Sequence, residues 1–357
     1  MQKDVNTIFL NLVRLGIGHY AEALIESACW KEIQNLAEVH GLYAVVLDAI
    51  EKLPSVSRPP QELLLEWIGK VLQDYEYRYK QYCKAITELT EFYNCHGYKM
   101  MVLKGYACSL NWPLPQHRPC GDIDIWLFGK QKEADALLKR EKGIHIDTSH
   151  HHHSVFDWND FTVENHFDFV NVYAESSSRQ IEKIFKQLGM DDSFFVEVHG
   201  EKVYLPSPNL HALFLIKHMV SHFAAAEINL RQVLDWAFYV EKHTKAINWE
   251  WLNGVLEDYH MKDFVSCINA ICVEDLGFNA SIFGIVQFNP HLKDRILDDI
   301  LEPEYGLTGP MGFFQGLVYK YNRWQGNAWK QRLCYKDSRL SMLVNGIWAK
   351  VLKPSSI

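Results

Sequence analysis

The chain has 357 residues, and 36 Lys and Arg residues stand against 44 Asp and Glu residues, so its formal net charge is −8. Domains that bind nucleic acid usually carry a clear basic excess, so this balance argues against nucleic acid as a partner. The apolar fraction of 48% is enough to form a hydrophobic core, which excludes a wholly disordered chain. The sequence has no apolar run long enough to span a membrane and no secretion signal at its start, and it therefore predicts a soluble cytoplasmic protein.

Helical spacing dominates residues 1–96, which we predict to be an N-terminal helical region. Apolar residues recur every three or four positions there, as on the buried face of an amphipathic helix. The short segments with this spacing are 5–15, 20–30 and 42–53. A proline-rich break over 54–60 follows, and the spacing then continues from Gln61 to Cys95. This pattern predicts a long helix that ends at Gly97.

Residues 97–206 change to a mixed pattern and predict an α/β block. Short apolar or alternating runs are typical of strands, and Asn159-Asp160 and Gly200 are typical hairpin turn residues. The predicted strands are 98–103, 122–128, 144–146, 154–158, 161–172 and the two arms of a hairpin over 194–205, and the predicted helices are 130–140 and 178–188.

Residues 207–357 return to helical spacing and predict a C-terminal helical domain with a basic tail. The predicted helices are 210–225, 228–243, 249–259, 264–276 and two more after Gly312. From Lys320 onward there are eight basic residues and one acidic residue, Asp337, with tryptophans between them. Such a tail could contact an anionic membrane surface. The favoured interpretation is that its tryptophans belong to the core and its cations offset the acidic remainder of the chain.

The residues best suited to chemistry are Lys104-Gly105-Tyr106, followed by Asp122-Ile123-Asp124. Residues i and i+2 of a strand project to the same face, so the two carboxylates should lie together. Adjacent carboxylates are costly without a cation between them, and Mg²⁺, which prefers oxygen ligands and phosphates, suits such a place. Gly105 allows a sharp turn into a helix whose first N–H groups could meet phosphate oxygens.

This segment resembles the nucleotidyltransferase superfamily of DNA polymerase β type, whose signature is a glycine turn, an Asp-x-Asp strand and a third carboxylate on a neighbouring strand. More narrowly, Leu-Lys-Gly at 103–105 followed by Arg-Pro-Cys-Gly-Asp-Ile-Asp-Ile at 118–125 is similar to a bacterial family of uncharacterised nucleotidyltransferases. Further matches are Val-Glu-x-His at 163–166, Leu205-Pro, His218 with His222, and Leu230-Arg231 with Asp235. The resemblance covers roughly Tyr98 to Val240, and it suggests that Arg231 and Asp235 brace the helical domain against the α/β block.

The resemblance implies an α+β fold with a polymerase β-like core, a mixed sheet with helices, flanked by N-terminal and C-terminal helical regions. It implies a Mg²⁺-dependent enzyme, with Mn²⁺ as the alternative ion, that transfers a nucleoside monophosphate from an NTP such as ATP to a hydroxyl acceptor and releases pyrophosphate. Asp122, Asp124 and Glu164 would be the metal ligands and catalytic residues. Glu164 is the expected third carboxylate because the Val-Glu-x-His match falls there. Asp168, expected on the same strand face, is the alternative.

Three basic residues could contact the nucleotide. Lys104 could bind a phosphate or pair with Asp122, and Arg118 could bind a phosphate or be a charge on a surface loop. Lys217 could reach the triphosphate or be solvated. Tyr106 follows the turn glycine at a position where the superfamily usually has Ser or Gly. This departure favours an alternative function, an inactive module of the same fold that senses nucleotides or binds a protein.

Two groups of histidines could bind a transition metal. His150, His151, His152 and His153 are consecutive, and because neighbouring residues on a strand face opposite sides, we expect them to line a polar edge near the site instead of sharing one ion. A tightly bound Zn²⁺ in this run would instead indicate a metal hydrolase. The pair His218 and His222, at i and i+4 on one helix, is expected at the edge of the core in preference to a Zn²⁺ site.

Overall fold

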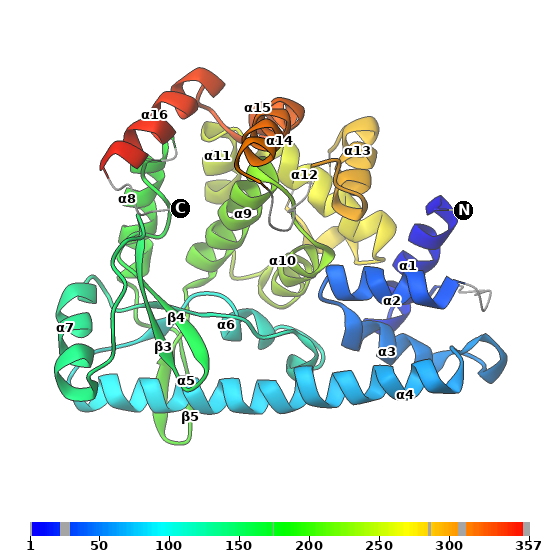
Figure 1. Ribbon diagram of the computed structural model, residues 1–357, viewed down its shortest axis with the longest axis horizontal. Helices are drawn as coiled ribbons and strands as arrows, with labels where there is room; N and C mark the ends of the chain where they lie inside the picture. The colour runs from blue at the N-terminus through cyan, green and yellow to red at the C-terminus, as the bar shows by residue number, and fades with distance from the viewer. Residues whose placement is uncertain (1, 22–28, 174, 285–286, 306–311, 353–357) are drawn as a thin grey trace.

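The computed structural model describes residues 2–21, 29–173, 175–284, 287–305 and 312–352. Its architecture is mixed α+β, with one six-stranded mixed sheet and helices packed around it (Figure 1). None of the helices in these ranges is long and apolar enough to cross a membrane.

The N-terminal helices lead into one long helix at the base of the molecule. They are α1 (Gln2–Gly16), α2 (Trp30–Val39), α3 (Tyr43–Lys52) and α4 (Gln61–Lys70). A π-helical segment (Val71–Tyr77) joins α4 to α5 (Arg78–Cys95), so the helix predicted from Gln61 to Cys95 is confirmed (Figure 1). The second predicted helix, 20–30, falls largely on residues outside the described ranges, and α2 begins where that prediction ends.

The sheet has the strand order β3-β4-β2-β1-β6-β5. Its strands are β1 (Met101–Val102), β2 (Ile123–Trp126), β3 (His153–Trp158), β4 (Phe161–His166), β5 (Phe195–Val198) and β6 (Glu201–Tyr204). β2 runs parallel to β4 and antiparallel to β1, while β3 and β5 are the hairpin partners of β4 and β6. Both predicted hairpins are confirmed, and Asn159 and Asp160 have the positive φ angles, 49° and 64°, that a tight hairpin turn needs.

One predicted strand does not form, and another ends earlier than predicted. No strand forms over 144–146, where the nearest pairing is an isolated bridge between Asp147 and Val155. The strand predicted to reach residue 172 ends at His166. The chain turns there because the N–H groups of Phe167 and Asp168 both donate to the carbonyl oxygen of His152.

The remaining helices surround the sheet or form the C-terminal part of the chain. Those between strands are α6 (Tyr106–Ser109), α7 (Gln131–Lys142) and α8 (Ser178–Gly189). Those after the sheet are α9 (Pro208–Ala225), α10 (Leu230–His243), α11 (Trp249–Asp258), α12 (Lys262–Ala270), α13 (Pro290–Leu301), α14 (Phe313–Gly326), α15 (Ala328–Cys334) and α16 (Arg339–Leu352). Helix α13 was not predicted, and three helices follow Gly312 where two were expected.

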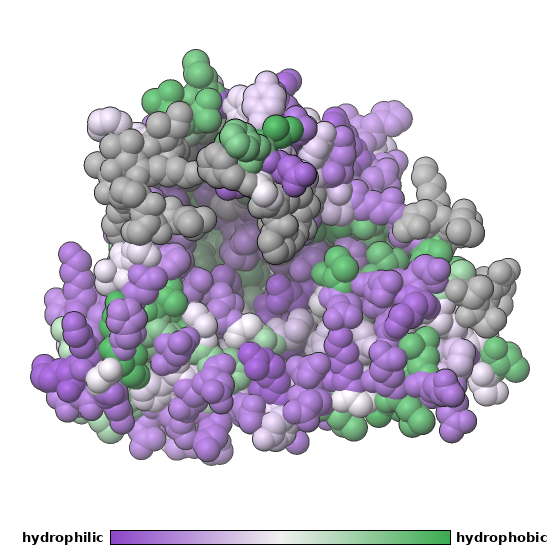
Figure 2. Space-filling model, in the orientation of Figure 1, coloured by the Kyte–Doolittle hydropathy of each residue, from purple (hydrophilic) through white to green (hydrophobic). Residues whose placement is uncertain are grey.

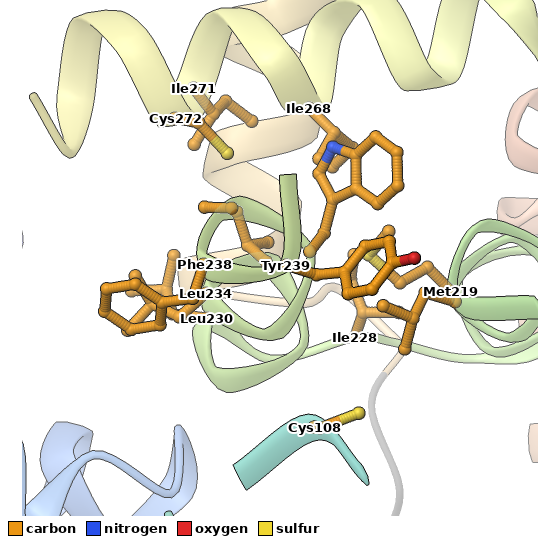
Figure 3. Packing of buried hydrophobic residues seen from close by; sticks show 14 of the residues in the cluster. Cys108, Met219, Ile228, Leu230, Leu234, Phe238, Tyr239, Ile268, Ile271 and Cys272 are labelled. Carbon is orange, nitrogen blue, oxygen red and sulfur yellow. The ribbon is translucent and has the colours of Figure 1, made fainter. Parts of the chain in front are cut away.

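Two clusters of buried hydrophobic residues form the core. One contains residues of α1–α4 together with residues of the C-terminal helices α9–α13, and the other joins α5 to the sheet. Figure 3 shows part of the first cluster, where Leu234 and Phe238 of α10 lie between Cys108 of α6 and Ile271 after α12. The N-terminal and C-terminal helices therefore share one core. The expected domain boundaries after residues 96 and 206 stay predictions.

The basic tail is partly core and partly surface. In α15, Trp329 packs edge to face against Phe223, and buried Lys330 pairs with Asp299 at 2.6 Å. These contacts agree with the core interpretation for that helix. Helix α16 instead exposes apolar side chains, and Figure 2 shows green atoms at the top of the molecule, where this helix lies. Its exposed apolar and aromatic residues are Leu340, Leu343, Val344 and Trp348. Contact of the tail with a membrane surface stays a prediction.

Candidate active site

Strands β2 and β4 bring the three predicted acids together. In their parallel pairing, Asp124 is the direct partner of Glu164, so the two residues lie side by side on neighbouring strands. Asp122 comes immediately before β2, and it lines the same cavity as Glu164. The Asp124 side chain is fully buried, whereas Glu164 keeps 24% of its side chain exposed. The acids thus combine one buried carboxylate with two that reach a cavity.

Two cationic groups approach one oxygen of Asp124. Lys104 Nζ lies 3.0 Å and His166 Nε2 lies 3.1 Å from Asp124 Oδ1. Lys104 follows β1, which pairs antiparallel with β2, and this pairing places it beside Asp124 and not in the expected pair with Asp122. The other oxygen, Asp124 Oδ2, is buried and has no hydrogen-bond partner among the described residues. A buried carboxylate oxygen without a partner fits a site for a divalent cation.

The charges in the site shift one another's pKa. Burial opposes the ionisation of Asp124, but Lys104 and His166 outweigh it and hold the pKa of Asp124 well below its usual value. Burial likewise disfavours the charged His166, yet its hydrogen bond to Asp124 and the nearby Glu164 carboxylate raise its pKa to about 9. For Asp122, burial and the neighbouring Asp124 charge raise the pKa. A cation bound between the acids would relieve that repulsion.

Gly105 makes the turn between β1 and α6 with a φ of +55°. A Cβ atom at this position would lie 2.3 Å from Tyr82 Oη, and the same hydroxyl donates a hydrogen bond of 2.9 Å to the carbonyl oxygen of Asp122. Glycine is therefore required so that a tyrosine of α5 can fix the start of β2. Helix α6 is a single turn, and within it the N–H of Ala107 donates to the carbonyl oxygen of Lys104. The binding of phosphate by this helix N-terminus stays a prediction.

Tyr106 is buried in the cluster that joins α5 to the sheet, and this burial raises its pKa to about 12. Its side chain is not among the residues that line the two cavities next to the acids. The tyrosine therefore takes a packing role and leaves the neighbourhood of the acids open.

A cavity of about 460 Å³ adjoins the acids. Its walls come from β4 and the residues after it, from α9, and from Tyr335 after α15. Small-molecule sites have volumes of roughly 300 to 1,000 Å³, so the cavity is large enough for a ligand of nucleotide class. The cavity lies between the α/β block and the C-terminal helices.

Lys217 and Arg118 have partners that the sequence did not predict. Lys217 is buried, pairs with Glu175 and lies 5.0 Å from the ring centre of Tyr335, so it is not solvated, although it lines the cavity. Arg118 is also buried, and its Nε and Nη2 atoms donate to the two oxygens of Asp235 at 2.7 and 2.9 Å. Arg118 is therefore not a charge on a surface loop, and its contact with a phosphate stays a prediction. It joins the loop before β2 to α10.

This pairing changes the predicted role of Arg231. Its expected partner, Asp235, is taken by Arg118, and Arg231 Nε has no hydrogen-bond partner among the described residues. Arg231 lines a second, smaller cavity together with Asp122 and Asp124. Sequence reasoning missed Arg231 as a candidate phosphate ligand because its i, i+4 spacing to Asp235 suggested a helix pair.

We expected Asp168 on the same strand face as Glu164, but the structure does not place it there. It lies beyond the end of β4, and its carboxylate pairs with Lys186 of α8. The premise for Asp168 as the third ligand is therefore wrong, whereas Glu164 lies directly beside Asp124.

The predicted histidines lie around the same cavity. His152 and His153 line it, with ring centres 4.3 Å apart, and burial together with the nearby His166 lowers the pKa of each to about 3. His218 and His222 line it from α9 with ring centres 4.4 Å apart. Burial lowers the pKa of both residues, so they are neutral at pH 7.

The mixed sheet with acids on adjacent central strands is that of the nucleotidyltransferase class. A family model described as uncharacterised nucleotidyltransferase matches residues 26–277, which is most of the chain, and the chain belongs to that family. No curated protein and no solved structure matches the chain. The family recognised from the Lys-Gly and Asp-x-Asp motifs, and the fold that it implies, are thereby confirmed.

Proposed function

We propose that this nucleotidyltransferase family member is a Mg²⁺-dependent enzyme that transfers a nucleoside monophosphate from an NTP to a hydroxyl acceptor and releases pyrophosphate. The observation that carries the proposal is the placement of Glu164 directly beside Asp124, with Asp122 two residues earlier in the chain. Three acids on two paired strands supply fixed oxygen atoms at one end of a cavity. The family assignment supports the transfer of a nucleotidyl group.

The donor set fits Mg²⁺, with Mn²⁺ as the alternative. Asp122, Asp124 and Glu164 would hold the ion, and the unpartnered Asp124 Oδ2 is the strongest sign that a ligand belongs there. When bound, Mg²⁺ neutralises charge that builds on the phosphate oxygens. Lys104 already provides one positive charge at Asp124, which keeps this carboxylate ionised before any ion arrives.

Glu164 is suited to accept the proton of the acceptor hydroxyl. Its carboxylate reaches the cavity, and His153 Nδ1 and His166 Nε2 lie 3.7 and 3.6 Å from Glu164 Oε2. In the proposed step, the acceptor oxygen bonds to the α-phosphorus while Glu164 takes its proton. The bond from the α-phosphorus to the bridging oxygen breaks, and pyrophosphate leaves with that oxygen.

Basic side chains near the acids are suited to the triphosphate. Lys104 and Arg231 line the smaller cavity together, and Arg231 has an unpartnered Nε for a phosphate oxygen. Lys217 lines the larger cavity, where its pairing with Glu175 makes it a weaker candidate.

The test is nucleotide binding and turnover by the full chain. Each of the four NTPs with Mg²⁺ should raise the melting temperature, and pyrophosphate should appear with a suitable small-molecule, sugar, protein or RNA hydroxyl. The double variant Asp122→Asn with Asp124→Asn should abolish both effects, while Asp157→Asn, an exposed acid on β3, should change neither. Unchanged melting temperatures with every NTP, and no pyrophosphate from any acceptor, would contradict the proposal.

The alternative of an inactive module rested on Tyr106. Because the Tyr106 side chain is buried away from the cavities, it no longer favours that alternative. Nucleotide binding that ignores Mg²⁺ and survives the double Asp variant would restore it.

A further inference from the structure

Three imidazoles converge on the cavity wall beside the acids. His152, His153 and His166 each offer a ring nitrogen, and these nitrogens lie within 4.8 Å of one another. We propose that the three histidines form a binding site for a transition-metal ion of the Zn²⁺ class, distinct from the Mg²⁺ site assigned to Asp122, Asp124 and Glu164. This inference goes beyond the proposed function, because the ion can bind whether or not the chain transfers nucleotides.

The backbone explains how consecutive histidines can share one ion. β3 begins at His153, so His152 precedes the strand, and its side chain need not point to the side opposite that of His153. The carbonyl oxygen of His152 accepts the N–H groups of Phe167 and Asp168, which anchors this residue at the end of β4. His153 is the direct partner of His166 in the β3–β4 hairpin. The expectation that the four histidines of the run do not share one ion stays a prediction, because the proposed site takes only two of them.

Two of the ring nitrogens lack a partner. The Nδ1 atoms of His152 and His153 are buried, and neither has a hydrogen-bond partner among the described residues. The nearest acid, Glu164, has its Oε2 atom 3.7 Å from His153 Nδ1, which is too long for a hydrogen bond. His153 as a whole is only 6% exposed, so bulk water does not compensate for this loss. Buried polar atoms are rarely left in this way, and a metal ion would supply the missing partner.

The third ring is held in an orientation that suits a ligand. His166 Nδ1 lies 3.2 Å from the carbonyl oxygen of Asp168, which can only accept, so Nδ1 carries the proton of that hydrogen bond. Nε2 therefore faces the acids and the cavity, and the proton that it shares with Asp124 in the metal-free chain must leave when an ion binds. Such an outer hydrogen bond to a backbone carbonyl is the usual support of a metal-binding histidine.

The ligand chemistry separates this site from the carboxylate site. Imidazole nitrogen suits Zn²⁺ and related ions, whereas carboxylate oxygen suits Mg²⁺. Glu164, which is assigned to the Mg²⁺ site, stands between the two groups, 3.6 Å from His166 Nε2, so the fourth position on the ion is left to water. The site opens onto the cavity, so an ion there remains accessible from solvent.

The experiment is a Zn²⁺ titration of the full chain without a purification tag, in competition with a chromophoric chelator. We expect one Zn²⁺ per chain with a dissociation constant in the micromolar range or below. His152→Ala and His153→Ala should each weaken binding by roughly tenfold or more. His145→Ala, an exposed histidine upstream of the run, is the matched control and should bind as the wild type does.

Two further measurements keep the test independent of folding defects. The Co²⁺-loaded wild-type chain should show the intense visible absorption of a tetrahedral site, and Asp122→Asn should keep its Zn²⁺ affinity. Weak Zn²⁺ binding by the wild type, or no such absorption, would overturn the proposal. A second outcome would also overturn it: His150→Ala and His151→Ala lose Zn²⁺ affinity, whereas His152→Ala and His153→Ala keep it. The ion would then bind at the surface of the run, as it does to a polyhistidine tag.

Discussion

Glu164 lies directly beside Asp124 in the parallel pairing of β2 with β4, although the two residues are far apart in the chain. The pairing fixes their relative position through the backbone ladder, so little side-chain entropy is lost in assembling the acids. A carboxylate that reaches the cavity is thereby held next to one that is fully buried. This arrangement leads to separate predictions for the site and for the stability of the chain.

The first prediction distinguishes the two candidates for the third acid. Glu164→Gln keeps the shape of the side chain but removes a proton acceptor, and it should lower the rate of pyrophosphate release by about a hundredfold or more. Asp168→Asn should have little effect, because the carboxylate of Asp168 pairs with Lys186 beyond the end of β4. Steady-state rates at saturating Mg²⁺ and NTP measure both variants. The opposite order of effects would make Asp168 the functional acid.

The second prediction concerns the cation that faces Asp124. Lys104→Met leaves the buried carboxylate with one cationic neighbour, His166, and should lower the free energy of unfolding by about 3 kcal/mol in the absence of metal. The more negative site should then gain more from Mg²⁺, so the melting temperature should rise further on Mg²⁺ addition than in the wild type. Differential scanning calorimetry with and without Mg²⁺ measures both effects.

Lys99→Met is the matched control for this variant. Lys99 pairs with Asp192 on the surface, where solvent screens an ion pair and its contribution to stability is small. The melting temperature of Lys99→Met should therefore stay close to that of the wild type, both with and without Mg²⁺. An equal loss of stability in the two variants would show that Lys104 does not offset the charge of Asp124.

The third prediction addresses the buried pair that joins the loop before β2 to α10. Arg118→Ala leaves Asp235 buried with only the N–H of Trp112 as a partner, and should lower the free energy of unfolding by about 3 to 5 kcal/mol. The exposed pair of Arg140 and Glu141 offers a control, because Arg140→Ala should cost about 1 kcal/mol or less. Urea unfolding curves measure both variants. A small effect at Arg118 would mean that the pair does not hold the two parts together.

The fourth prediction is a loss of stability in mild acid. Burial lowers the pKa of His40 to about 4 in the folded chain, whereas an unfolded histidine has a pKa of about 6.5. Between pH 6.5 and 4 the unfolded chain therefore binds a proton that the folded chain excludes. Stability is full above pH 6.5 and falls as the pH drops through this window, by up to about 3 kcal/mol for this residue.

Urea unfolding at a series of pH values measures this dependence. His40→Gln should make it shallower by the share of one histidine, because the replacement does not titrate, whereas His152 and His153 still contribute. The exposed His145→Gln should leave it unchanged. If His40→Gln kept the full pH dependence of the wild-type stability, His40 would not contribute to that dependence.

Local patterns were enough to predict much of this molecule. The spacing of apolar residues located the long helix, and the Asp-x-Asp motif located β2 and two of the acids, because both signals depend on neighbours in sequence. The pairing of Arg118 with Asp235 and the burial of Lys217 against Glu175 depend on contacts between distant segments. No spacing rule could identify those partners.

The error at Asp168 has a clear physical origin. Asp168 was placed on a strand by its apolar neighbours, but the turn after His166 is made by hydrogen bonds to His152, a residue of another segment. Tertiary contacts decided where the strand ends, and the sequence pattern does not contain that information.

The most direct test of the central claim is equilibrium binding of non-hydrolysable analogues of the four NTPs, with and without Mg²⁺, to the wild type and to the double variant Asp122→Asn with Asp124→Asn. The account predicts that at least one analogue binds the wild type, that Mg²⁺ strengthens this binding by tenfold or more, about 1.4 kcal/mol, and that the double variant loses the Mg²⁺ dependence. Binding that is equal with and without Mg²⁺, or that is unchanged in the double variant, would contradict it.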